Sequence, residues 1–215
     1  MAEQQKCKKL ASVLVEHQDH FGVMPDDDCQ WAIQHPKEAV VLFADAVKNR
    51  LVVAVKKLLE RLSTTIALPA MNGFTAKEHF VVDTSSRARV KISGFGTNLK
   101  TNFLPKVERG AVAAEDLAVN KLLDYANDPA IITFLGGESK VEISLGQFFA
   151  AFAKQPSGEA GALLTNGYAN IGYIRDINGV LWAVVGGWGG GGWYFGARPL
   201  GDPLGWLPAY QVLSR

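Results

Sequence analysis

The pair Asn178-Gly179 constrains the fold more than any other feature, because it stands between two runs of β-forming residues. The two runs cover residues 168–174 and 180–185. Asn-Gly readily adopts the two positive φ angles of a type I′ turn, whose twist matches that of paired strands. We therefore expect an antiparallel hairpin here. A two-residue turn would place Arg175 opposite Trp182, within reach of a cation–π contact.

More β structure is expected after the hairpin. Residues 193–197 and 210–213 have the composition of two further strands. The glycine-rich run 186–192 lacks the Lys-Ser/Thr pair and the following helix of a phosphate-binding loop. It is expected to be a loop between strands. The C-terminal region is thus predicted to be an aromatic-rich antiparallel β unit.

The aromatic side chains of this unit suggest a binding role. Exposed Trp and Tyr on a β surface can bind sugars, peptides or proline-rich segments, although most of the rings are expected to form core. Trp188, which stands among glycines, is expected to be the most exposed ring. We predict a non-enzymatic binding or assembly protein that acts through this unit. The candidate contact residues are Trp188, Trp193, Trp206 and Arg175.

The rest of the chain indicates helices followed by a mixed segment. Apolar residues recur at intervals of three and four along 36–62, which predicts a long helix. Shorter helices are expected over 3–20, 112–126, 129–135 and 145–155, and strands over 64–68, 79–83 and 88–93. We therefore predict an α+β fold, with an N-terminal helical region (1–64) and an α+β domain (65–215) whose C-terminal antiparallel β unit packs on helices.

A local basic segment offers an alternative function. The formal net charge of +1 argues against attraction of the whole surface to nucleic acid. Arg87, Arg89 and Lys91 nevertheless alternate, so a strand would present all three cations on one face. Such a strip, within residues 87–106, could follow a phosphate backbone. It could also be the solvent face of an amphipathic strand, which is the favoured interpretation.

A second alternative is a zinc-binding or enzymatic protein. Four potential zinc ligands lie near the N-terminus: His17, His20, Cys29 and His35. Their spacing matches no common zinc module, and a solvated helix end explains the same residues. No Gly-x-Ser-x-Gly nucleophile motif is present in the sequence. A non-enzymatic protein is therefore favoured, and no cofactor is predicted.

Composition also suggests a compartment and a kind of partner. The two cysteines, Cys7 and Cys29, are too few for a disulfide framework, which favours a reduced, cytoplasmic protein. The polar N-terminus lacks the apolar core of a signal peptide, and no membrane partner is expected. The apolar stripe of 36–62 is longer than that of most globular helices. We expect a protein partner or self-association, with nucleic acid the less favoured partner.

Two motifs in the C-terminal region carry a family resemblance. They are ALLTNGYANI at 162–171 and RDINGVLWAV at 175–184, accompanied by HFVVDT at 79–84 and LGGE at 135–138. In these stretches residues 65–215 resemble a recurring C-terminal region of uncharacterised bacterial proteins from uncultured bacteria with small genomes. That family has no assigned activity, so the resemblance assigns no role to any residue.

Overall fold

The computed structural model describes residues 34, 35, 37, 41 and 57–215. The chain divides into two units, Met1–Lys56 and Lys57–Arg215, and the strands and helices named below belong to the second. The predicted helix 3–20 and the greater part of the predicted helix 36–62 lie outside the described residues.

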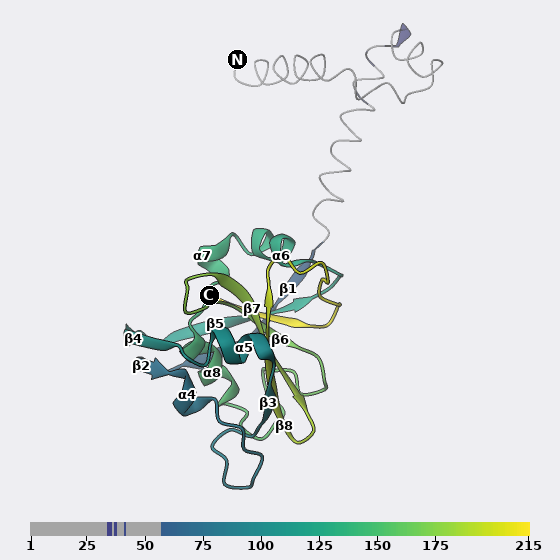
Figure 1. Ribbon diagram of the computed structural model, residues 1–215. Helices are drawn as coiled ribbons and strands as arrows, with labels where there is room; N and C mark the ends of the chain where they lie inside the picture. Colours follow the sequence, from purple (N-terminus) through teal and green to yellow (C-terminus); the bar gives the residue numbers. More distant parts are fainter. Residues whose placement is uncertain (1–33, 36, 38–40, 42–56) are drawn as a thin grey trace. The chain divides into compact units, whose positions relative to one another are not determined.

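A mixed sheet of seven strands dominates the described part of the chain, in the order β1-β5-β9-β6-β7-β8-β3 (Figure 1). The strands are β1 (Leu59–Leu68), β3 (Ile92–Phe95), β5 (Glu115–Leu122), β6 (Asn170–Arg175), β7 (Leu181–Gly189), β8 (Gly192–Pro199) and β9 (Gln211–Ser214). β9 runs parallel to β6 and β3 runs parallel to β8, whereas the other neighbours are antiparallel. The predicted α+β class, in which a C-terminal antiparallel β unit packs on helices, is therefore wrong: one mixed sheet dominates and the helices are short.

The predicted helix 112–126 accounts for much of this error. These residues form the end of β4 (Val107–Val112) and all of β5. Their Ala, Glu and Leu content favours a helix. However, β5 lies between β1 and β9, and the four residues from Leu117 to Asn120 are all buried. Burial on both faces of a central strand outweighs local helix propensity here.

The segment between β2 (Met71–Thr75) and β5 also differs from the prediction. Residues 79–83 do not form a strand, because α4 (Ala76–His79) ends there and only Asp83 makes an isolated bridge, with Ile92. Of the predicted strand 88–93, residues 88–91 have irregular backbone, and only Ile92 and Ser93 are extended, as the start of β3. The last residues of the predicted helix 36–62 are extended as well, since β1 begins at Leu59.

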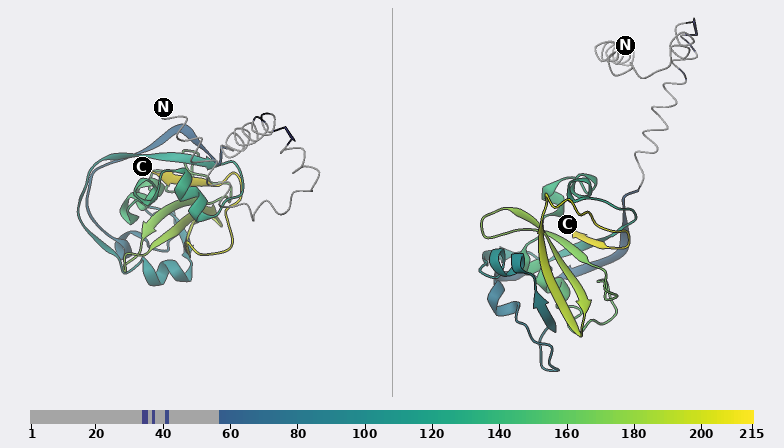
Figure 2. Two further views of the ribbon diagram at one scale, coloured as in Figure 1. Left: turned by 90° about the horizontal axis from the view of Figure 1, so that it is seen from above. Right: turned by 45° about the vertical axis from the view of Figure 1, so that its right-hand side comes forward.

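Two strand pairs form one bent ribbon along the side of the sheet. β2 (Met71–Thr75) pairs with β4 in a separate two-stranded sheet, and β1 pairs with β5. Only Pro69 and Ala70 separate β1 from β2, and Pro69 has no N–H to continue a ladder. The ribbon therefore bends at this point. Figure 2 shows its blue and teal strands curving together around one side.

The helices are short and lie against the sheet and the ribbon. They are α4, α5 (Thr97–Asn102), α6 (Asp128–Phe134), α7 (Glu138–Val141) and α8 (Leu145–Phe152). Figure 1 shows α6 and α7 side by side, and the two are in contact. The predicted helices at 129–135 and 145–155 are confirmed as α6 and α8, and the cap predicted at Ser144 is present.

α8 is the central element of the core. Seven of its eight residues are buried, and it contacts β1, β2 and β6. Its ring side chains require glycine in the strands beneath. A Cβ atom at Gly172 would lie 2.7 Å from Phe148, and one at Gly186 would lie 2.3 Å from Phe152. Both distances are too short for a real contact, so the two glycines allow α8 to approach the sheet closely.

The predicted hairpin between β6 and β7 is confirmed, but its register differs. Arg175 lies opposite Leu181 and not opposite Trp182. The backbone N–H of Gly179 donates to Asp176 O, the N–H of Asp176 donates to Val180 O, and Gly179 has a φ of 79°. This pattern is a three-residue loop with a bulge at the glycine, so the type I′ geometry is not formed.

The glycine-rich run forms a tight hairpin. Gly189 pairs with Gly192, and the two residues between them, Gly190 and Gly191, both have positive φ. Two such residues are typical of a type I′ turn, which matches the twist of the strands it joins. Most of the run therefore extends β7 into the turn to β8, and the expected loop is reduced to two residues.

Candidate functional site

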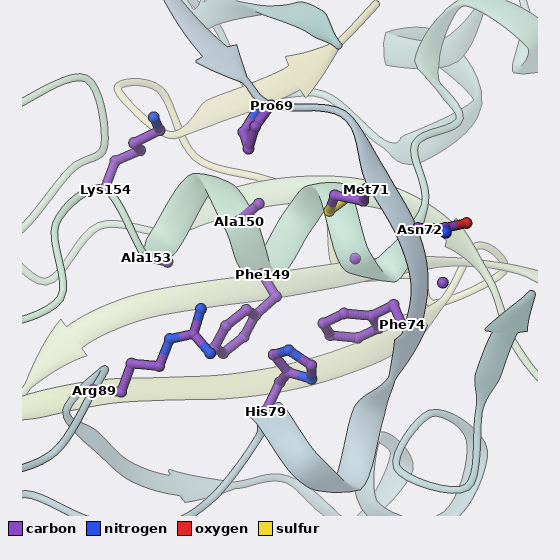
Figure 3. A pocket seen from close by; sticks show the side chains of 12 residues that line it. Pro69, Met71, Asn72, Phe74, His79, Arg89, Phe149, Ala150, Ala153 and Lys154 are labelled. Carbon is purple, nitrogen blue, oxygen red and sulfur yellow. The ribbon is translucent and has the colours of Figure 1, made fainter. Parts of the chain in front are cut away.

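A pocket lies between the ribbon and α8, and we call it the edge pocket. Its cavity volume is about 430 Å³. It is lined by Pro69, Met71, Asn72, Gly73, Phe74, His79, Arg89, Gly146, Phe149, Ala150, Ala153 and Lys154. Figure 3 shows the labelled residues of β2 on one side of this pocket and those of α8 on the other. No residue of β4 lines it, so the pocket opens on the side of β2 that faces away from β4.

A carboxylate from the ribbon fixes the position of α8 beside β2. Glu108 Oε1 accepts the backbone N–H of Leu145 at 2.8 Å, and Oε2 accepts that of Gly146 at 2.9 Å. Ser144 and Gln147 add a capping box at the same helix end. These bonds satisfy N–H groups that a helix leaves without partners, and the negative charge suits the helix dipole.

Aromatic rings form the floor of the edge pocket. The ring centroids of Phe74 and His79 are 4.4 Å apart, and those of His79 and Phe149 are 5.3 Å apart. His79 Nδ1 lies 3.0 Å from Thr75 O. Because a carbonyl oxygen only accepts, Nδ1 carries the proton and donates it. In the neutral imidazole, Nε2 is then an acceptor.

Two cations give the edge pocket its electrostatic character. Arg89 and Lys154 are both exposed and both line it, and its lining contains no acidic residue. Neither forms an ion pair with any residue that the structure describes. Glu78 and Asp83 line a neighbouring hollow of about 110 Å³, which shares His79, Arg89 and Phe149 with the edge pocket. The edge pocket therefore offers two cations to a ligand.

The three cations singled out from the sequence do not share a strand face. Arg87 is exposed in the irregular segment before β3 and does not line the edge pocket. Lys91 is half-buried, and its backbone carbonyl accepts the N–H of Trp193 at 2.8 Å. Of the three, only Arg89 lies at the edge pocket.

The aromatic residues proposed as contacts lie mainly in the core. Trp193 is fully buried, and its Nε1 donates to Gln155 O at 2.9 Å. Trp206 is also buried, and its Nε1 donates to Asp128 Oδ1 at 2.6 Å. Trp188 is half-buried against Trp193, with ring centroids 5.3 Å apart. Binding through Trp188 stays a prediction.

In the C-terminal β region, Arg175 forms ion pairs and two tyrosines are exposed. The Arg175 guanidinium lies 2.7 Å from Glu138 Oε2 and 3.1 Å from Glu142 Oε2, so it joins the hairpin to α7 and to the residue after it. These contacts, together with the register of the hairpin, replace the expected contact with Trp182. Tyr194 and Tyr168 are exposed, more than Trp188 is.

A buried carboxylate connects α6 to the sheet. Asp128 Oδ1 accepts the hydroxyl of Tyr173 at 2.8 Å and the indole N–H of Trp206. Burial raises the pKa of the Asp128 carboxyl, although the hydrogen bonds from Trp206 and Tyr173 oppose that rise. Burial also raises the pKa of the Tyr173 hydroxyl. Asp128 does not line the edge pocket, so we assign this network to stability.

The structure describes only one of the four proposed zinc ligands. His17, His20 and Cys29 lie outside the described residues, and His35 is described and exposed. Among the residues that the structure describes, no three His, Cys, Asp or Glu side chains gather as a metal ion would require. Within the same residues, no helix is long and apolar enough to cross a membrane.

Comparison with known proteins assigns neither a family nor an activity. The chain matches no protein-family model, no curated protein and no solved structure.

The sequence does not reveal the edge pocket, because the residues that line the pocket come from distant segments of the chain. Its lining combines 69–74, 79, 89, 146–154 and no contiguous motif. The sequence contains two partial signals: Arg89 belongs to the alternating basic residues of 87–91, and the capping residue Ser144 marks the start of α8. Neither signal indicates that β2 lies beside α8.

Proposed function

We propose that the chain is a non-enzymatic binding protein whose ligand site is the edge pocket. The observation that carries this proposal is the pair Arg89 and Lys154, which have no acidic partner among the described residues and flank a floor of aromatic rings. The cavity volume is within the range of about 300–1,000 Å³ that is usual for ligand pockets.

The side chains define the chemistry of the ligand. Phe74, Phe149 and Met71 offer apolar contact, and the two cations attract a carboxylate or another anion. His79 Nε2 adds one polar contact point at the floor. A ligand with an apolar body and a negative charge therefore fits best.

The test uses 8-anilinonaphthalene-1-sulfonate, a fluorescent aromatic anion, titrated into the full chain. Saturable binding is expected in the wild type. The double variant Arg89→Gln/Lys154→Gln should weaken it by about tenfold, because two exposed charges are lost. Both residues are exposed, so the variant should keep its fold, and its circular dichroism spectrum checks this.

Arg87→Gln/Lys100→Gln is the matched control, since both residues are exposed and neither lines the edge pocket. It removes the same net charge and should leave the affinity within about twofold of the wild type. Equal weakening by both double variants would indicate a general charge effect and would contradict the proposal. That outcome would instead favour a diffuse basic surface.

A further inference from the structure

The edge pocket continues along the ribbon into a second hollow. This hollow has a cavity volume of about 290 Å³ and lies between β1 and the end of α8. It is lined by Thr65, Ile66, Ala67, Ala151, Lys154, Gln155, Ala160, Gly161 and Ala162. Lys154 lines both hollows, so they adjoin. We call the two together the edge groove.

One wall of the edge groove is an open strand edge. β1 is the first strand of the sheet and pairs only with β5, and β2 pairs only with β4, among the described strands. No residue of β4 or β5 lines either hollow. The groove therefore follows the unpaired side of the ribbon, where alternate residues present backbone N–H and C=O groups without a strand partner.

The side chains on this edge leave room for another chain. Thr65, Ala67 and Pro69 are exposed, whereas Ile66 and Leu68 point into the core. These three exposed residues have short side chains, and none of the residues from Thr65 to Phe74 is charged. A natural sheet edge is commonly protected by charges or by a covering segment. Among the described residues that line the edge groove, the only charged side chains are Lys154 and Arg89.

We propose that the edge groove binds an extended acidic peptide segment, which adds a strand to the open edge of β1 and β2. This inference rests on the proposed binding role of the edge pocket. Backbone hydrogen bonds to the ribbon would hold the peptide, as in other cases of strand addition. Its acidic side chains would face Arg89 and Lys154. An apolar side chain would lie on the floor that the packed rings of Phe74 and Phe149 form.

A peptide explains more of the groove than a small anion does. A small anion would use the cations and the floor of the edge pocket, but neither the second hollow nor the strand edge. The stretch from Thr65 to Phe74 is long enough to pair with a heptapeptide, which as a strand extends over about 23 Å. Charge complementarity selects an acidic sequence, because Arg89 and Lys154 are the only charged residues of the lining.

The first experiment selects a phage-displayed library of random linear heptapeptides on the full chain. The selected sequences should alternate acidic and apolar residues. Synthetic versions should bind the wild type and should bind Arg89→Gln/Lys154→Gln about tenfold more weakly, as loss of two charge contacts predicts. Arg87→Gln/Lys100→Gln should bind them as the wild type does. A selection with no peptide that distinguishes the two double variants would overturn the proposal.

The second experiment tests the strand itself. Single N-methyl groups are placed at successive backbone amides of one selected peptide. A strand uses alternate N–H groups, so methylation at every other position should weaken binding by about tenfold and the positions between should tolerate it. Amides of β1 and β2 should also gain protection from hydrogen exchange. Uniform tolerance of methylation, or unchanged exchange in both strands, would contradict strand addition.

The two proposals fail in different ways. If the fluorescent anion binds through Arg89 and Lys154 but no selected peptide does, the binding role holds and the peptide inference is wrong. If neither probe depends on these cations, both are wrong.

Discussion

The ring of Phe152 in α8 lies directly on Gly186 of β7, so closely that a Cβ atom at this glycine would be 2.3 Å from the ring Cζ. The same atom would be 2.9 Å from Phe195, which is also buried. Neither ring can move easily, because Phe152 also packs against Trp193 with ring centroids 4.7 Å apart. The approach of the central helix to the sheet therefore depends on the missing side chain at this position.

Gly186→Ala should lower the free energy of unfolding by about 1–3 kcal/mol, the usual cost of overpacking a core. Urea denaturation followed by tryptophan fluorescence measures this. Gly189→Ala in the same strand is the matched control, because a Cβ atom there meets nothing within 4 Å. Its effect should stay below about 0.5 kcal/mol. Equal losses in the two variants would show that strand flexibility, and not contact with Phe152, explains the result.

Glu108→Gln should loosen the start of α8. The glutamine keeps one acceptor oxygen but loses the charge and one of the two bonds to Leu145 and Gly146. A loss of about 1–2 kcal/mol in the free energy of unfolding is expected, as for other helix caps. Hydrogen exchange should quicken at these two amides. Glu78→Gln, an exposed change in α4, should not alter exchange at α8; if it does so equally, the cap is not the cause.

The sequence predicts an element correctly where the residues that determine it lie within the element or next to it. The cap at Ser144 and the paired glycines after α6 mark helix ends by local hydrogen bonding and backbone angles, and both helices are present. β5 shows the opposite case. Its composition is helical, and only its position between β1 and β9 makes it a strand. Pairing with strands about fifty or more residues away is not encoded in the segment itself.

The hairpin shows a similar limit at smaller scale. Asn178-Gly179 correctly predicted a turn, but Asp176 changed its type. The Asp176 carboxylate accepts the backbone N–H groups of Asn178 and Val180, at 2.8 and 2.9 Å. This favours a longer loop and shifts every partner by one residue relative to a two-residue turn. The type I′ geometry occurs instead at Gly190 and Gly191, where no neighbouring side chain competes for the turn N–H groups.

The candidate site was less predictable than the elements. The aromatic residues chosen from the sequence are largely core, since Trp193 and Trp206 are buried with their N–H groups bonded. Burial of a ring depends on which faces are covered, and α8 covers one face while the segment around Trp206 covers part of the other. The sequence pattern drew attention to Arg89 as one of three alternating cations. It does not reveal which residues surround Arg89 at the edge pocket, because they are brought together by the bend of the ribbon at Pro69.

Asp128 should contribute to stability as an acceptor rather than as a charge. Asp128→Asn keeps an oxygen for the Tyr173 hydroxyl and the Trp206 indole, and should stay within about 1 kcal/mol of the wild type at pH 7. Asp128→Ala leaves two buried donors without an acceptor and should cost about 2–4 kcal/mol. Urea denaturation compares the two variants. Equal losses would mean that the carboxylate charge matters more than the acceptor.

Because the pKa of Asp128 is raised, the difference in stability between the wild type and Asp128→Asn should depend on pH. Burial favours the protonated carboxyl in the folded state, so the folded chain binds more protons than the unfolded chain between the two pKa values. The contribution of Asp128 to the free energy of unfolding must then fall as pH rises from about 4 through the folded pKa. Asparagine does not titrate. The stability of Asp128→Asn relative to the wild type should therefore increase from pH 4 to pH 7, and a decrease would contradict the assignment.

Asp176 should show the opposite pH dependence. Burial acts to raise the pKa of its carboxyl, but the N–H groups of Val180 and Asn178 and the indole of Trp182 outweigh burial and lower it. The folded state therefore favours the ionised form. The stability this supplies is present above the unfolded pKa of about 3.9 and is lost as pH falls through the folded pKa. Asp176→Asn should be about 1 kcal/mol less stable than the wild type at pH 7. Denaturation at successive pH values should show that gap narrowing below pH of about 4, and a gap that widens in acid would refute the role of the ionised carboxylate in the turn.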